Sequence, residues 1–546
     1  MERGSSLNYS RPVWRFLRTF AVPWPAQTAY YRLITGPTLI RETQIPHLML
    51  LLLISACGVH LRAQPFRPQV PKVWDEAALK DWATPLAGLN LRPTHMTEKE
   101  YYSRPVWDLA TYPVYYPGHE PAGYWEMLRT AKPVRLIERE KLKTEADWIE
   151  AGRRVFHSAA QLLPNPDPSV VAAARNPQTY SGLKPYPDGT VGRLGWVPTA
   201  DGIGLTGKGI CAGCHDRLTS DGGSIPGVPF LEIFGSRFGF AAQDVMVRQM
   251  RPGGLSGSPP FVLAGSIGMR HYQAYATPWR SDASPEYWQQ ASDAELAALR
   301  QAYRASGGTP RWNGSLHYPA KTPDLIGIKD RKYIDATGTH LNRGIGDLMR
   351  YAALITSTET VDFGPHRMLA EGTKRYGYRW SDEALYALAL YIYSLKPPPN
   401  PNPFDAKAQA GQKIFEREGC VNCHRPPLYT NNKLTLAKGL KPPPSNLDVL
   451  PISVGTDQGL ALKTRKGTGY YKVPSLRGVW YRGRYLHDGS VASLEEMFNP
   501  DRVKDTHVPG GFIPAGLKTW AIQGHEFGLK LDAAEREQLI AFLRTL

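Results

Sequence analysis

Two short stretches decide the class of this chain: Cys211-Ala-Gly-Cys214-His215 and Cys420-Val-Asn-Cys423-His424. Each is a CxxCH motif, in which two residues separate the cysteines and a histidine follows directly. This spacing lets both sulfurs form thioethers with the vinyl groups of one haem while the histidine supplies a nitrogen to the iron. The motifs therefore predict two covalently bound haem c groups, attached through Cys211, Cys214, Cys420 and Cys423, with His215 and His424 as axial ligands.

A CxxC pair also occurs in structural zinc sites and in thiol–disulfide redox centres. Zinc would require four ligands from a more regular set of cysteines and histidines. Redox CxxC motifs do not require the histidine that follows both motifs here. The haem interpretation is therefore favoured over both alternatives.

The sequence around each motif repeats as well. Ala151-Gly152-Arg-Arg-Val155-Phe156 matches Ala410-Gly411-Gln-Lys-Ile414-Phe415. Within each copy the glycine and the phenylalanine are four residues apart and lie on one helical face, where glycine permits a close helix crossing and phenylalanine fills the space beside it. Each motif is thus predicted to follow a similar helix.

A second helix is predicted to close each unit, over 381–395 and over 532–546. Both begin at a residue that favours the helix N-cap, and Asp532 with Glu535 forms a capping-box pattern. The first helix runs into a stretch with prolines at 397, 398, 399, 401 and 403, which cannot continue a helix.

The predicted fold class is mainly α, with two tandem cytochrome c-type haem domains, long irregular loops and an N-terminal extension. The expected divisions are a leader at 1–63, an irregular aromatic- and proline-rich extension at 64–140, a first domain at 141–396, a linker at 397–404 and a second domain at 405–546. We expect the extension to pack on the haem core through its aromatic side chains.

The two domains differ in their insertions. There are 54 residues between Phe156 and Cys211 but only 4 between Phe415 and Cys420. Extra loops around one haem favour a built pocket there, because functional residues concentrate on elaborated loops. Stabilising decoration or partner contact is the alternative.

The charge distribution bears on possible partners, and the N-terminal sequence bears on the location of the protein. The net charge is +16, yet the basic residues are scattered without a Lys/Arg-rich block, so we expect no nucleic-acid partner. The apolar run 47–57 is too short to span a membrane and fits a signal-peptide core. Export to the periplasm, the cell surface or the medium is predicted, with either cleavage near Ala63 or a lipid anchor at Cys57.

The opposite axial position of each iron separates electron transfer from substrate chemistry. For the second haem, His525 is favoured, because it stands just before the terminal helix. His487 is the next candidate, with a hydrogen bond to a haem propionate or a carbonyl as its other role. Met497 is the thioether option, and His507 also follows the motif.

No spacing identifies the sixth ligand of the first haem. The possible ligands are His271, His317, His340 and His366. Most of these are expected to be structural, so an open or weakly ligated first iron is favoured. Trp312 or Trp380 could lie between the haems, although core packing is the more common role of a tryptophan.

These features resemble a known family. The tandem CxxCH units, with the stretch from Val473 to Trp480 leading into Tyr485-Leu-His-Asp-Gly-Ser490, look like the bacterial dihaem cytochrome c peroxidase superfamily, which includes MauG-like enzymes and rubber oxygenases. The long N-terminal region and the Tyr-Ser-Leu-Lys-Pro-Pro-Pro boundary bring the chain closest to the rubber-oxygenase-like branch. In peroxidases of this group the resemblance would imply a methionine on the second haem, whereas Met497 stands early for that role.

Three functions remain open. The favoured one is an exported dihaem oxidoreductase, in which the haem at His215 reacts with O2 or a peroxide and the haem at His424 relays electrons. Its partners would be a redox protein or a small-molecule oxidant, and an apolar substrate in the oxygenase version. The alternatives are an electron-transfer dihaem cytochrome c without substrate chemistry, and a haem-based sensor or interaction subunit.

Overall fold

The computed structural model describes residues 66–546, apart from several segments. The segments left out are 88–90, 201, 209–210, 220–223, 442–447 and 464–466. Three longer segments are described only in part: 164–187 and 230–317 at four positions each, and 356–378 at 362–363. The predicted leader with Cys57 and Ala63 lies outside the described residues. So do His271, His317, His366 and Trp312.

The first pair of predicted helices is present and crossed as expected. Helix α5 (Glu145–Phe156) begins at a capping box formed by Thr144 and Asp147. It packs against α13 (Asp382–Ser394), which starts at the N-cap Ser381. A Cβ atom at Gly152 would lie 1.9 Å from the backbone oxygen of Ala387, so only glycine allows this approach.

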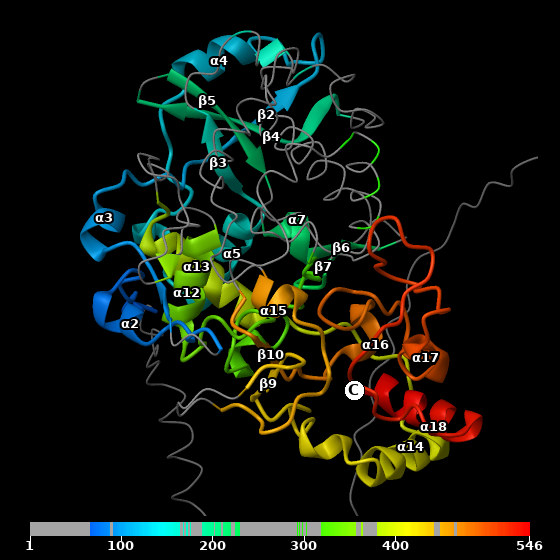
Figure 1. Cartoon of the computed structure of the whole chain (residues 1–546). Coiled ribbons are helices and arrows are strands. Elements are labelled where there is room, and N and C mark those ends of the chain that lie inside the picture. The colour runs from blue at the N-terminus through cyan, green and yellow to red at the C-terminus, as the bar shows by residue number, and fades with distance from the viewer. Residues whose placement is uncertain are drawn as a thin grey trace, which may run out of the picture. The chain divides into compact units, whose positions relative to one another are not determined.

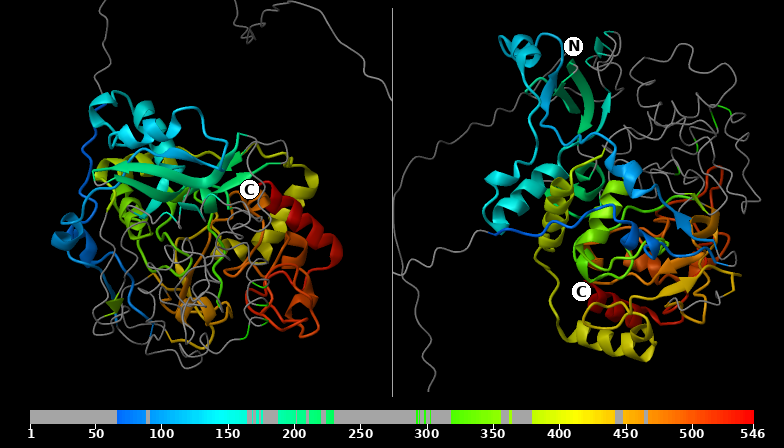
Figure 2. Two further views of the ribbon diagram at one scale, coloured as in Figure 1. Left: turned by 90° about the horizontal axis from the view of Figure 1, so that it is seen from above. Right: turned by 90° about the vertical axis from the view of Figure 1, so that its left-hand side faces the viewer.

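The second pair repeats this crossing. Helix α14 (Ala406–Arg417) lies alongside α18 (Ala533–Arg544), as Figures 1 and 2 show. A Cβ atom at Gly411 would again lie 1.9 Å from a backbone oxygen, here that of Gln538. The predicted capping box of Asp532 and Glu535 is present. The repeated glycine thus marks the same helix contact in both halves of the chain.

The aromatic residues beside these crossings also match. The ring centres of Phe156 and Tyr391 are 5.3 Å apart in the first half, and those of Phe415 and Phe542 are 5.3 Å apart in the second. Each pair belongs to its own hydrophobic core. We refer below to residues 141–396 and 405–546 as the first and second units.

The N-terminal extension packs into the first core, as predicted. Trp74, Trp82 and Tyr101 are fully buried there, and the Trp82 ring nitrogen donates to the Leu341 carbonyl at 3.0 Å. The extension also has short regular elements that the sequence did not indicate: α2 (Glu76–Lys80), β1 (Pro93–Thr94), α3 (Glu98–Tyr102), β2 (Tyr112–Tyr115) and α4 (Tyr124–Thr130).

The insertion ahead of Cys211 corrects one expectation. Long irregular loops were predicted there, but strands β3 (Ala159–Leu163), β4 (Thr190–Thr199) and β5 (Gly202–Lys208) join β2 in a sheet of order β2-β4-β5-β3. Trp196, Leu194 and Leu205 bury one part of this sheet against α4. Because β4 and β5 pair from Thr199 and Gly202 onward, a short hairpin connection sets their register.

The remaining described elements are short and connect the helices. They are η1 (Arg139–Lys141), α7 (Ala212–His215), β6 (Asp216–Leu218), β7 (Ser224–Pro226), η3 (Ile328–Asp330), α12 (Ile345–Ala353), β8 (Asp362–Phe363), η5 (Cys420–Asn422), β9 (Leu434–Leu436), α15 (Gly459–Lys463), β10 (Tyr470–Lys472), α16 (Val479–Arg482), α17 (Leu494–Met497) and η6 (Pro500–Val503). The described residues between 66 and 546 belong to one compact unit. Within the described part of the chain, no helix is both long and apolar enough to cross a membrane.

Candidate haem-binding sites

Both CxxCH motifs fold into the same tight turn. The His215 amide donates to the Cys211 carbonyl at 2.9 Å, and the His424 amide donates to the Cys420 carbonyl at 2.9 Å. The turn brings the two sulfurs and the imidazole of each motif close together along the chain. The four cysteines form no disulfide.

The thiols lie in apolar surroundings. Cys211 packs against the first core and Cys420 against the second. Burial raises the pKa of Cys211 to about 12 and that of Cys420 to about 11. Because redox-active CxxC pairs depend on a lowered thiol pKa, this environment does not suit a dithiol redox centre.

The histidine of each motif has a fixed orientation. The Nδ1 atom of His215 lies 2.9 Å from the carbonyl oxygen of Pro323, and Nδ1 of His424 lies 3.1 Å from that of Tyr429. A carbonyl can only accept, so each Nδ1 carries the proton and each Nε2 keeps its lone pair for a metal. Both imidazoles are therefore in the tautomer that an axial ligand requires.

A cavity of about 370 Å³ opens beside the second motif. Its apolar walls come from α14 and α18 through Phe415, Leu539 and Leu543, and Cys420 and His424 form another side. This volume lies in the range of cofactor sites, which are mostly apolar with a few directed polar groups. The second CxxCH motif thus faces a space of the kind that a haem needs.

His525 lies across this cavity from His424. Their ring centres are 6.2 Å apart, at an interplanar angle of 61°. Two imidazoles bound to one metal, with metal–nitrogen distances of about 2 Å, have their ring centres roughly 6 Å apart. The buried Nδ1 atom of His525 has no hydrogen-bond partner among the described residues. The spacing of the two rings is that of two imidazoles bound to one metal ion, and ligation itself stays a prediction.

Arg502 holds His525 in place. Its side chain is fully buried and donates to the carbonyl oxygens of Met497, Ile522, Gly524 and His525 at 2.6–3.1 Å. Burial, His424 and this guanidinium together lower the pKa of His525 to about 4. His525 is therefore neutral above that pH, as a metal ligand must be.

Met497, the thioether candidate, lines the same cavity and is buried in the second core. Its position therefore leaves the thioether option open. Its backbone oxygen accepts from Arg502 at 2.9 Å, so the segment carrying Met497 is joined to the one carrying His525.

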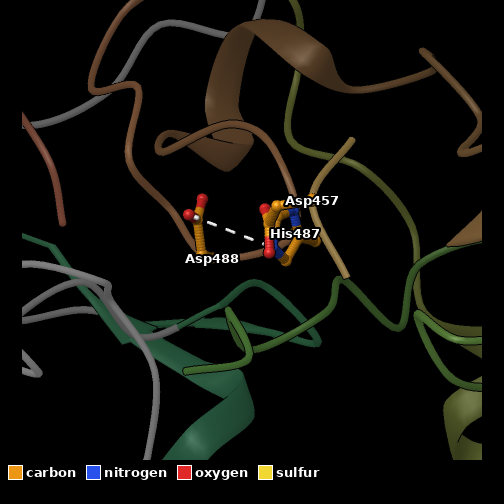
Figure 3. A group of neighbouring side chains, drawn as sticks. All are labelled: Asp457, His487 and Asp488. Carbon is orange, nitrogen blue, oxygen red and sulfur yellow. Dashed lines mark ion pairs between the residues drawn. The ribbon is translucent and has the colours of Figure 1, made fainter. Parts of the chain in front are cut away.

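His487 also lines the cavity but is engaged by acidic groups. Its Nε2 lies 3.1 Å from Asp457 and 3.9 Å from Asp488, and Figure 3 shows the three side chains together. Burial alone would lower the pKa of His487, but the two carboxylates outweigh it and raise the pKa to about 9. A protonated imidazole cannot bind iron, so these ion pairs argue against ligation by His487. Its predicted hydrogen bond to a haem propionate or a carbonyl stays a prediction.

The Asp-Gly sequence after His487 forms a tight turn. The Asp488 carboxylate accepts from the Ser490 amide at 3.0 Å, and Gly489 has a φ of 73°. The ligand atoms of Asp457, His487 and Asp488 lie within 4.8 Å of one another, the spacing of a possible metal site. The ion pairs already account for this arrangement.

The remaining described histidine candidates take structural positions. His340 is fully buried, with Nδ1 at 3.1 Å from Asp335 and Nε2 at 3.2 Å from His95. Both of its ring nitrogens thus have partners in the first core. His507 pairs with Glu496 at 3.0 Å. Trp380 is buried in the first core, in agreement with the packing role.

Four cationic residues of the cavity escaped the sequence analysis. Lys321, Arg331, Lys472 and Arg482 line its wall. A signal was available, because Lys321-Thr-Pro-Asp-Leu-Ile-Gly327 and Lys472-Val-Pro-Ser-Leu-Arg-Gly478 share the pattern Lys-x-Pro-x-Leu-x-Gly. The pattern becomes visible only when the two segments are aligned with each other.

The chain thus has two CxxCH turns with matched imidazole tautomers, each beside its own helix crossing. Relatives confirm the resemblance to the dihaem cytochrome c peroxidase superfamily. The chain is 28% identical over 205 residues to the cytochrome-c peroxidase IdrP1 of Denitromonas iodatirespirans, which covers 31% of this chain and 52% of that protein. It is 26% identical over 146 residues to the methylamine utilization protein MauG of Methylorubrum extorquens, covering 26% of this chain and 35% of MauG.

The chain thus spans about half the length, or less, of these curated relatives. No family model matches it. Among solved structures, hydrazine synthase of Kuenenia stuttgartiensis has a TM-score of 0.27 at 15% identity, covering 56% of this chain and 92% of that one. A MauG-like protein associated with microbial copper homeostasis has a TM-score of 0.26 at 16% identity, covering 42% and 75%. Scores this low carry no argument.

Proposed function

We propose that this chain is a dihaem c-type oxidoreductase with one haem on each CxxCH motif. The observation that carries the proposal is the pair His424 and His525, which face each other across an apolar cavity beside Cys420 with ring centres 6.2 Å apart. The relatives named above, a cytochrome-c peroxidase and MauG, support the same class.

The residues divide the work of holding each cofactor. Cys211 and Cys214 would attach one haem and Cys420 and Cys423 the other, while His215 and His424 would bind the irons through Nε2. The carbonyls of Pro323 and Tyr429 retain the protons on the two Nδ1 atoms. When bound, the haems supply one-electron redox chemistry, and a haem with an open axial position also binds O2 or a peroxide.

The second site is proposed to relay electrons. His525 is neutral and fixed by Arg502, so it would be able to bind the iron opposite His424 and keep small ligands out. Two nitrogen ligands also stabilise the ferric state better than a nitrogen and a thioether do. The second site would thus be a low-spin electron donor.

The first site is proposed to be the reactive one. Its support is the insertion of 54 residues between Phe156 and Cys211, part of which forms the sheet β2-β4-β5-β3. In a peroxidase version the oxidant is a peroxide, and in an oxygenase version, closer to the rubber-oxygenase-like branch, it is O2 with an apolar substrate. A redox protein would supply or accept electrons.

The proposed location is the periplasm, the cell surface or the medium. Its support is the apolar run at 47–57 and the predicted attachment of haem c. Mass spectrometry of the purified protein tests it: acylated Cys57 would mark a lipoprotein, and an N-terminus near Gln64 an ordinary cleaved signal peptide.

Haem content and spin state test the proposal. A pyridine haemochrome assay should give two haems per chain, one haem fewer in a Cys420→Ser/Cys423→Ser variant and one fewer in Cys211→Ser/Cys214→Ser. Electron paramagnetic resonance should show a bis-histidine signal that His525→Ala removes and His487→Ala preserves. One haem or none in the wild type would defeat the proposal.

Reaction with oxidants decides between catalysis and electron transfer. Peroxide added to the oxidised protein, or O2 added to the reduced protein, should change the spectrum of the haem on His215. Two bis-histidine signals that respond to neither oxidant would favour the electron carrier instead.

A further inference from the structure

The repeated pattern Lys-x-Pro-x-Leu-x-Gly occupies equivalent places in the two units. It runs over 321–327 in the first unit and 472–478 in the second, and an arginine follows four residues after each closing glycine. Gly327 has a φ of 71° and Gly478 a φ of 76°, and each caps the short helix that follows it, η3 or α16. We call these two segments the paired lysine segments.

Each of the paired lysine segments donates hydrogen bonds to the opposite unit. The Lys321 amide donates to the His487 carbonyl at 2.9 Å, and the Lys472 amide donates to the Ala336 carbonyl at 3.0 Å. His487 and Ala336 each stand thirteen residues after the proline of their own segment, so they are equivalent positions.

The two lysine side chains also donate to equivalent positions of the opposite unit. Nζ of Lys321 donates to the Arg484 carbonyl at 2.9 Å, and Nζ of Lys472 donates to the Tyr333 carbonyl at 3.1 Å. Arg484 and Tyr333 are again equivalent, ten residues after each proline. Reciprocal contacts between equivalent residues define an approximate two-fold axis at this junction.

Positive charge gathers at this axis without matching negative charge. Lys321, Arg331, Lys472 and Arg482 all line the cavity, and Asp324 is the only carboxylate-bearing residue among its described lining. Arg331 and Arg482 share Asp324, at 3.4 and 3.5 Å. Neither lysine has a carboxylate partner in the described part of the chain, and their ammonium groups bond only to neutral carbonyls.

Burying these two lysine side chains without a carboxylate partner is energetically unfavourable. Burial, reinforced by a neighbouring arginine, lowers the pKa of Lys321 to about 7 and that of Lys472 to about 7. Buried charges without partners are strongly unfavourable, whereas a carboxylate that accepts from arginine and lysine together is held by strong charge-assisted hydrogen bonds. The junction is therefore suited to an anion that the described part of the chain does not supply.

We propose that Lys321, Arg331, Lys472 and Arg482 form one carboxylate-binding site at the junction of the two units, and that its ligands are the propionate groups of both haems. All four cations line the cavity beside the second motif, and Lys321 stands two residues before Pro323, whose carbonyl accepts from His215 of the first motif. This proposal rests on the proposed dihaem function. The four cations would then have a shared effect on the haems. Positive charge beside both haems favours their reduced states, so removal of one charge should lower the midpoint potentials of both haems.

The test compares Lys321→Met with Lys472→Met in the haem-loaded full chain. Midpoint potentials are measured by spectroelectrochemical titration after haem content has been verified. We expect both variants to keep two haems and to lower both potentials, and Lys321→Arg and Lys472→Arg to restore them. Lys530→Met, at an exposed position, is the matched control and should change neither potential.

Three results would overturn the proposal. Unchanged potentials in both methionine variants, with two haems present, would show that the cations do not face haem carboxylates. A shift confined to one haem would refute a shared site. If the potentials of the wild type depend on added inorganic phosphate and those of the variants do not, the site binds a free oxyanion instead. A wild type without haem would refute the proposed function itself, so the two failures are distinguishable.

Discussion

The guanidinium of Arg502 donates a hydrogen bond of 2.7 Å to the backbone oxygen of His525, whose side chain faces His424. The hydrogen bonds of Arg502 go to the backbone carbonyls of Met497, Ile522, Gly524 and His525. Arg502 acts on the cavity through the backbone. By donating to the carbonyls of Ile522, Gly524 and His525, it fixes the conformation of the segment that ends at His525. His525 has a φ of 51°, a left-handed conformation that a non-glycine residue adopts only under such constraint.

Replacement of Arg502 should therefore loosen the axial histidine. In Arg502→Gln, the carbonyls of Met497, Ile522, Gly524 and His525 lose their shared donor, at a cost of about 1–3 kcal/mol in the free energy of unfolding. The optical spectrum should show a high-spin fraction that the wild type lacks. Arg536→Gln on α18 is the control. A fully low-spin Arg502→Gln protein would show that His525 does not need this support.

The two helix crossings should respond alike to one added methyl group. Gly152→Ala and Gly411→Ala each place a Cβ 1.9 Å from a backbone oxygen, so the helices must separate, with a loss of about 1–3 kcal/mol in stability. Gly346→Ala in α12 meets nothing closer than 3.4 Å and should leave stability equal or slightly higher. Thermal unfolding of the three variants measures the difference, and equal midpoints would contradict the crossing geometry.

The acid sensitivity of the second unit should trace to His525. Its pKa is about 4 in the folded chain, below the ordinary value of 6.5. Folding thus favours the neutral imidazole, and this contribution is complete above pH 6.5 and declines as the pH falls toward 4. The low-spin spectrum should be constant from pH 9 to 6.5 and weaken below that. A spectrum that changes equally in His525→Ala would assign the effect elsewhere.

His487 should give the opposite dependence. Its pKa of about 9 lies above the ordinary 6.5, so its ion pairs with Asp457 and Asp488 stabilise the fold fully below pH 6.5 and lose effect as the pH rises through 9. Unfolding midpoints measured from pH 6 to 10 should fall in the wild type. Asp457→Asn should flatten that decline, and an unchanged slope would mean that His487 is not charged in the folded protein.

The features that could be predicted from the sequence are those specified by local patterns. The CxxCH turns, the glycine at each crossing and the capping box of Asp532 and Glu535 each depend on residues within one or two helical turns. Those interactions are visible as spacings. The place of His525 before the terminal helix made it the favoured sixth ligand, and the structure sets its ring 6.2 Å from that of His424, while ligation stays a prediction.

Other features depend on partners far away in the chain. Lys472 bonds to the carbonyls of Tyr333 and Ala336, more than a hundred residues earlier, and no local pattern specifies such a partner. The engagement of His487 by Asp457 is likewise a tertiary contact. The strands β4 and β5 are rich in glycine, which is unfavourable in strands, so their pairing overrides local propensity.

The reciprocal bonds of the paired lysine segments also bear on the proline-rich stretch at 397–404. The surfaces that join the two units are specified by the units themselves, in the manner of a symmetric dimer whose subunits have been fused end to end. The linker then serves chiefly to keep the halves at a high effective concentration. A chain cut within this stretch would still carry, on its two fragments, every contact described between Lys321 and His487 and between Lys472 and Ala336.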